Sequence, residues 1–183
     1  MTGEDKIFSY ENNEGLSASL EDYLEVIFHL EQSNRVARAK DIADQMNVQR
    51  ASVTGALKAL AGRGLINYSP YSFITLTTSG RDIARDVIRR HRTLKEFFMN
   101  TLQLSPDDAE ANACRMEHAI DPAAAERLVR FLEFMRVCPR AGADWFDAFA
   151  RFCKLGVRTS DCQACLKLCA ERLEAERPAK PAD

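Results

Sequence analysis

The sequence predicts a mainly α-helical protein that begins with a winged helix-turn-helix, and three observations support this prediction. Leu and Ala recur throughout the 183 residues, while aromatic residues make up only 8%, a composition that favours helices. Several segments show the apolar spacing of amphipathic helices. Their order is helix, short helix, tight turn, helix and hairpin, which is the order of three helices followed by a β-hairpin wing.

Apolar spacing, capping residues and helix breakers place the individual elements. The first part of the chain is expected to form helices over about 17–32, 39–46 and 49–63 and then hairpin strands over 65–68 and 73–76. Ser17 or Ser19 caps the first helix, and Gly64 ends the third. Three further helices are expected over about 80–102, 105–119 and 121–136.

Charge and composition narrow the class of protein. The net charge is only −2, but the stretch from Arg35 to Arg92 holds 11 Lys or Arg against 4 acids, a local charge of +7. Such a stretch suits a phosphate backbone, although an ordinary solvated helical surface has the same appearance. No apolar run is long enough for a membrane span, and the polar, acidic N-terminus is no export signal. We therefore expect a cytoplasmic protein with no membrane partner, whose six cysteines are thiols or ligands rather than disulfides.

The winged-helix pattern predicts contacts with double-stranded DNA. The helix after the tight turn would enter the major groove, and the tip of the hairpin would lie against the backbone. The candidate DNA-binding residues are Arg38, Gln49, Arg50, Ser52, Thr54, Lys58 and Tyr71. The alternative is that these are ordinary polar positions in a helical bundle.

A second pattern suggests a metal site. Cys114, Glu117 and His118 lie at i, i+3 and i+4 and so share one helix face, and their side chains are three of the main ligand types for first-row transition metals. Asp22 and Glu25 form a carboxylate pair at i, i+3 in the first helix, although acids there also favour the helix dipole. His91 stands among arginines in the long helix and is either a further ligand or a surface histidine.

Together these segments resemble the diphtheria toxin repressor and manganese transport regulator family of metal-dependent repressors. The matching stretches are Leu20-Glu21-Asp22-Tyr23-Leu24-Glu25, Ile27-Phe28-His29-Leu30, Ala39-Lys40-Asp41-Ile42-Ala43, Ser52-Val53-Thr54, Gly64-Leu65-Ile66, Leu76-Thr77-Thr78-Ser79-Gly80, Arg90-His91-Arg92 and Ala113-Cys114-Arg115-Met116-Glu117-His118. The resemblance implies repression of metal-homeostasis genes when a divalent metal is bound. It also implies a homodimer that reads a palindromic operator.

The resemblance implies a metal site made of Asp22, Glu25, His91, Cys114, Glu117 and His118. This set combines two branches of the family, because the Asp22–Glu25 pair matches the manganese branch and Cys114 matches the iron branch. A thiolate favours Fe(II) over Mn(II), whereas carboxylates and imidazoles accept either ion. The ancillary site of the iron branch is not expected, because Lys95 and Glu110 stand where that branch has a Glu and a His.

The resemblance also suggests a division of the chain. The expected parts are a flexible leader over 1–16, a winged helix-turn-helix over 17–80, a helical metal-binding and dimerisation domain over 81–136, a short Cys-rich helical extension over 137–177 and a disordered tail over 178–183.

The Cys-rich extension is a candidate second site for Zn(II) or an iron–sulfur cluster. Its candidate ligands are Cys138, Cys153, Cys162, Cys165 and Cys169. Their spacing is irregular, and several of these cysteines would equally serve as small buried hydrophobes. Two other functions stay open on the sequence alone: a DNA-binding regulator that senses redox, zinc or iron–sulfur state through these cysteines, and a metal-dependent hydrolase.

Overall fold

The computed structural model describes residues 15–34, 36–69 and 72–138, together with 146, 149, 150 and 153. These residues form a mainly helical protein with one small hairpin, as predicted. The elements are α1 (Ala18–Asn34), α2 (Ala39–Met46), α3 (Arg50–Gly62), β1 (Ile66–Asn67), β2 (Thr75–Leu76), α4 (Thr78–Glu96), the π-helix η1 (Phe97–Thr101), α5 (Pro106–Met116) and α6 (Pro122–Val137). None of the described helices is both long and apolar enough to cross a membrane.

The first three helices and the hairpin share one hydrophobic core, and α1 lies against it along most of its length. Leu24 and Ile27 of α1 are fully buried, together with Ile42 of α2, Leu57 of α3 and Ile74 beside β2. The 3.6-residue apolar spacing of α1 therefore becomes a buried face. This arrangement confirms the winged helix-turn-helix.

The hairpin is shorter than the expected runs over 65–68 and 73–76. Its strands pair antiparallel through Ile66 with Leu76, and an isolated bridge joins Ala37 to Ile74. Glu31, near the end of α1, fastens the hairpin to the helices. Its Oε1 accepts the Leu76 backbone N–H at 2.8 Å, and its Oε2 lies 2.7 Å from Nη2 of Arg81 in α4.

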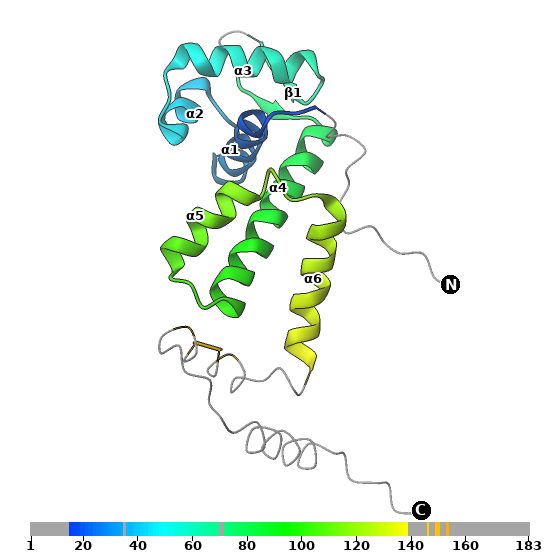
Figure 1. Cartoon of the computed structure of the whole chain (residues 1–183). Helices are drawn as coiled ribbons and strands as arrows, with labels where there is room; N and C mark the ends of the chain where they lie inside the picture. Colours follow the sequence, from blue (N-terminus) through cyan, green and yellow to red (C-terminus); the bar gives the residue numbers. More distant parts are fainter. Residues whose placement is uncertain are drawn as a thin grey trace, which may run out of the picture.

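The second half of the molecule is organised around α4. This helix runs away from the winged helix-turn-helix, and α5 and α6 pack on either side of it (Figure 1). Ala109 and Ala113 are fully buried, and their small side chains let α5 approach α4 closely. The metal-ligand candidates on α4 and α5 are brought together by this approach.

Two helix boundaries differ from the sequence-based expectation. The helix expected over 80–102 ends at Glu96 and continues as η1, where Phe97 packs against Phe131 of α6 with ring centroids 6.2 Å apart. This aromatic contact offsets the wider and less regular π-turn. The helix expected over 105–119 ends at Met116, and a turn follows it before Asp121 caps α6 ahead of Pro122.

Candidate metal centre and nucleic-acid interface

Glu117 lies in the middle of the candidate metal centre, which comprises Asp22, Glu25, His91, Cys114, Glu117 and His118. Glu117 is only 3% exposed. One of its carboxylate oxygens, Oε2, lies 2.5 Å from Nδ1 of His91, and the other, Oε1, lies 3.2 Å from Nε2 of His118. A single buried carboxylate therefore joins the imidazoles of two different segments.

The other three candidate ligands surround this pair of contacts. Asp22 Oδ1 lies 2.8 Å from His118 Nε2, and the Cys114 sulfur lies 4.0 Å from His91 Nδ1. Glu25 lines a cavity of about 400 Å³ together with His91, Cys114 and Glu117. The structure thus places the six side chains in one region, from α1, α4, α5 and the turn after α5. Their ligand atoms include two groups within 4.8 Å of one another: Asp22 with Glu117 and His118, and His91 with Cys114 and Glu110.

The turn after α5 aims Glu117 and His118 at the centre. Glu117 keeps helical backbone angles (φ −59°, ψ −30°), and its N–H still donates to the Ala113 carbonyl at 2.9 Å. The next donors, from Ala119 and Ile120, both reach back to the Met116 carbonyl. The expected helical spacing of Cys114, Glu117 and His118 is therefore nearly preserved, although the helix itself ends one residue before Glu117.

The electrostatics of the centre reflect an excess of negative charge. Hydrogen bonds to Asp22, Glu117 and Glu21 raise the pKa of His118 to about 11. The hydrogen bond to Glu117 also raises the pKa of His91, despite the opposing effect of burial. His118 is therefore protonated at neutral pH, and its positive charge is balanced by the surrounding carboxylates.

The remaining candidate ligands have pKa values that indicate the same excess. Burial raises the pKa of Glu25, and the charge of Glu117 raises it further. Burial and the neighbouring carboxylates likewise raise the pKa of the Cys114 thiol. Carboxylate, imidazole and thiol groups held in an electronegative pocket form a donor set that fits a divalent transition metal.

Metal binding is expected to be linked to pH through His118. Its folded-state pKa of about 11 lies above the ordinary 6.5. Its proton therefore stabilises the metal-free fold fully below pH ~6.5, and this contribution is lost as the pH rises towards 11. Because Nε2 must lose this proton to bind metal, we expect metal affinity to rise roughly tenfold per pH unit around neutrality. Calorimetric metal titrations in buffers of different ionisation enthalpy measure the proton released.

The matched variant for this measurement is His118→Gln, which keeps a polar side chain but has no titrating ring. It should release fewer protons than the wild type and show a shallower pH dependence. Equal proton release by the two proteins would contradict the role assigned to His118.

Two further carboxylates lie at the centre. Glu21 was not among the predicted ligands, and Glu110 stands where the iron branch has a His of its ancillary site, which was not expected here. Glu21 is buried, and its Oε2 lies 2.5 Å from Nδ1 of His118. Glu110 Oε1 lies 3.3 Å from Nε2 of His91, and its other oxygen lies 2.6 Å from the Lys95 ammonium. Their neighbours are distant in sequence, so no local pattern identifies them.

The described DNA-binding candidates are all exposed. Gln49 is the N-cap of α3, and Arg38 is the N-cap of α2. The other described candidates follow along α3, and all of them are exposed: Arg50, Ser52, Thr54 and Lys58. Tyr71 lies outside the described residues.

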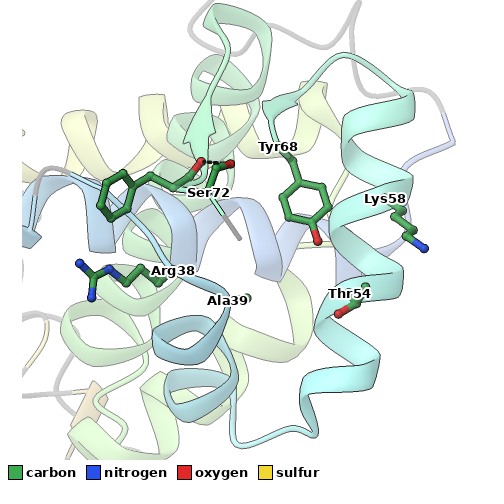
Figure 2. Close-up of a pocket in the computed structure, with 7 residues that line it drawn as sticks. Arg38, Ala39, Thr54, Lys58, Tyr68 and Ser72 are labelled. Carbon is green, nitrogen blue, oxygen red and sulfur yellow. Dashed lines mark hydrogen bonds between the residues drawn. The ribbon is translucent and has the colours of Figure 1, made fainter. Parts of the chain in front are cut away.

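A groove runs between α3 and the hairpin. It has a volume of about 940 Å³, and its lining includes Arg38, Thr54, Lys58, Tyr68 and Ser72. Figure 2 shows Thr54 and Lys58 on one side, Arg38 and Ser72 on the other, and Tyr68 between them. A concave surface with basic residues on both sides is suited to an anionic backbone.

The C-terminal cysteines are described only in part. Cys138 is half-buried at the end of α6, Cys153 is exposed, and both are free thiols. Cys162, Cys165 and Cys169 lie outside the described residues. The second metal or cluster site therefore stays a prediction.

Comparison with known proteins gives two matches to models of one family. Residues 15–74 match the N-terminal DNA-binding domain of the iron-dependent repressors. Residues 77–146 match the metal-binding and dimerisation domain of the same repressors. These two models fall on the winged helix-turn-helix and on the helices that carry most of the candidate metal centre.

Individual relatives are similar over the same region. An uncharacterised HTH-type transcriptional regulator of Methanocaldococcus jannaschii is 37% identical over 119 residues, which cover 64% of this chain and 95% of the relative. The transcriptional regulator MntR of Escherichia coli is 34% identical over 101 residues, which cover 55% of this chain and 64% of MntR. A solved manganese-dependent transcriptional repressor in complex with manganese is 31% identical with a TM-score of 0.58, over 68% of this chain and 59% of that one.

These matches favour a repressor over the alternative of a metal-dependent hydrolase, because the family consists of transcriptional regulators rather than enzymes. The chain spans nearly the whole archaeal relative but less than two thirds of MntR and of the solved repressor. From its two matching domains, its fold and its candidate metal centre, we conclude that the chain belongs to the iron-dependent repressor family, which includes the diphtheria toxin repressor and MntR and whose members are metal-dependent, DNA-binding transcriptional repressors.

Proposed function

We propose that this protein represses metal-homeostasis genes when Fe(II) or Mn(II) binds at the candidate metal centre. The observation that carries the proposal is the meeting of Asp22 and Glu25, from the helix that packs on the DNA-binding core, with His91, Cys114, Glu117 and His118 from the second domain. Fe(II) is the preferred ion in this proposal, because Cys114 supplies a soft sulfur ligand. Two solved relatives are described as a manganese regulator and a manganese-dependent repressor, so Mn(II) is the alternative.

The proposed mechanism is a change in how firmly α1 is held. A bound divalent cation supplies a shared positive charge for the clustered carboxylates. Asp22 and Glu25 then hold α1 against His91 of α4 and Glu117 of the turn after α5. Because Leu24 and Ile27 of the same helix are buried in the winged-helix core, the orientation of α3 is fixed as well. DNA affinity rises because the binding-competent arrangement becomes more populated.

A homodimer is part of this proposal. Phe131, Phe134 and Val137 of α6 are 38%, 57% and 78% exposed. They are spaced three residues apart and therefore lie along one side of the helix. An exposed apolar strip of this kind is suited to a subunit interface, and the family model for this region is a dimerisation domain. A twofold dimer would place two α3 helices on a palindromic operator.

The proposed function is tested by metal-titrated binding to the DNA upstream of the protein's own gene. Fe(II), Mn(II) and Zn(II) are compared anaerobically, and a chelator provides the metal-free state. We expect strong DNA binding only with metal, and strongest with Fe(II) or Mn(II).

Lys58→Ala should weaken DNA binding at saturating metal and reduce the slope of log affinity against log salt by about 1.

Metal affinity provides the control for Lys58→Ala, since Lys58 lies on the groove far from the candidate metal centre in the fold. The variant should bind metal as the wild type does. Equal DNA affinity with metal and with chelator would overturn the proposed function.

A further inference from the structure

His118 presents its two ring nitrogens to different kinds of partner. Nε2 faces the candidate metal centre, 2.8 Å from Asp22 Oδ1 and 3.2 Å from Glu117 Oε1. Nδ1 faces Glu21 instead, at 2.5 Å from Oε2. Because Glu21 directly precedes Asp22, its side chain leaves α1 about 100° further round the helix. Adjacent residues of α1 thus contact opposite sides of one imidazole.

Glu21 is held in place by a buried arginine. Arg90 of α4 is 2% exposed, and its Nη2 lies 3.4 Å from each carboxylate oxygen of Glu21. The Nε of Arg90 is bound in turn by the Asp86 carbonyl at 3.4 Å. A buried carboxylate requires a paired cation to stay ionised. The nearby guanidinium favours the ionised form of Glu21, whose carboxylate faces both His118 and Arg90.

We propose that the Glu21–Arg90 pair positions His118 for metal binding without itself binding metal; this inference rests on the proposed function. A neutral imidazole has one proton. When that proton is on Nδ1 and donated to Glu21, the lone pair of Nε2 is directed at the candidate metal centre. The pair therefore selects one tautomer and fixes the plane of the ring.

His91 has a similar but exposed arrangement, which offers an internal comparison. Its Nε2 faces Glu110 at 3.3 Å, and Glu110 is paired with Lys95 at 2.6 Å. The side chains of Glu110 and Lys95 are 47% and 39% exposed, whereas those of Glu21 and Arg90 are 5% and 2% exposed. Water screens the exposed pair, so its influence on His91 is expected to be smaller.

The test measures the affinity of the purified full-length protein for Mn(II) alone, by calorimetry, in four forms: wild type, Glu21→Gln, the control Glu133→Gln on the exposed side of α6 and the double variant Glu21→Gln with Arg90→Met. We expect Glu21→Gln to weaken Mn(II) binding by about 10- to 100-fold. Glu133→Gln should leave Mn(II) affinity unchanged. Thermal unfolding with chelator reports the stability of each form.

The double variant separates positioning from stability. Glu21→Gln removes a buried carboxylate that faces Arg90 and is expected to lower the stability of the metal-free protein. Replacing both partners also removes the buried charge of Arg90 and should restore part of that stability, but it should not restore Mn(II) affinity. Recovery of Mn(II) affinity along with stability would overturn the proposal, because it would reduce Glu21 to a structural partner of Arg90.

NMR spectroscopy determines directly which ring nitrogen of His118 carries the proton. In the Zn(II)-loaded wild type, the ¹H–¹⁵N spectrum of the imidazole of His118 should place the proton on Nδ1. A proton on Nε2 would overturn the proposal.

If the wild type bound metal and DNA normally while Glu21→Gln matched its Mn(II) affinity, this inference would fail and the proposed function would stand. If the wild type bound no metal, the proposed function itself would fail.

Discussion

Replacement of Glu117 by Gln is expected to abolish metal-dependent DNA binding while leaving the fold intact. The Glu117 side chain contacts both His91 and His118 through its carboxylate oxygens and is almost completely buried. The amide has nearly the same shape but no charge, so the centre loses its one carboxylate that joins both imidazoles. We expect metal affinity to fall by at least about 100-fold, and DNA binding at moderate metal to fall to the level seen with chelator.

The control for Glu117→Gln is Glu133→Gln, which makes the same chemical change at an exposed position of α6. It should bind metal and DNA as the wild type does. Circular dichroism and thermal unfolding with chelator check that both variants are folded. Metal-stimulated DNA binding at wild-type strength in Glu117→Gln would refute the assignment of this residue to the metal centre.

Replacement of Gly80 by Ala is expected to cause the largest loss of stability. Gly80 is buried in the first turn of α4, where a Cβ atom would lie 2.0 Å from the Leu65 carbonyl oxygen and 2.9 Å from its carbon. Both atoms are backbone, so the hairpin or the start of α4 must move. The move also strains the Thr77 cap, which accepts the Gly80 N–H and donates to the Gly64 carbonyl. We expect a loss of about 3 kcal/mol or more in the free energy of unfolding.

Gly55→Ala provides the matched comparison for Gly80→Ala. Gly55 is exposed in the middle of α3, and a Cβ atom there would meet nothing within 4 Å. Ala is the better helix former, so this variant should gain about 0.5–1 kcal/mol. Chemical denaturation with chelator measures both variants. Similar stabilities for the two alanine variants would show that the contact of Gly80 with Leu65 relaxes without cost.

The local part of the candidate metal centre was accessible from the sequence. Cys114, Glu117 and His118 share a helix face by spacing alone, and the carboxylate pair in α1 has the same property. Their meeting with His91 was implied by the family resemblance rather than by any local pattern. It depends on the close approach of α4 and α5 over the buried Ala109 and Ala113.

The features that the sequence does not reveal depend on contacts between distant segments. Glu21 and Arg90 are separated by 69 positions and meet only when α1 packs on α4. Glu21 is otherwise an ordinary acid in the first turn of a helix, where the helix dipole favours one. The π-helix that begins at Phe97 is equally hidden, and its first residue contacts Phe131 of α6, which is distant in sequence.

The 17 residues of α1 form one continuous rod about 25 Å long. Asp22 and Glu25 lie in its first half, and Glu31, which holds the hairpin, lies near its other end. In the proposed switch, operator DNA and metal ions would therefore act on the same rigid element. Any factor by which metal tightens operator binding must then equal the factor by which the operator tightens metal binding. A repressor already bound to its promoter would take up metal at a lower metal concentration than a free one. Each promoter would therefore help to set the metal concentration at which it is repressed.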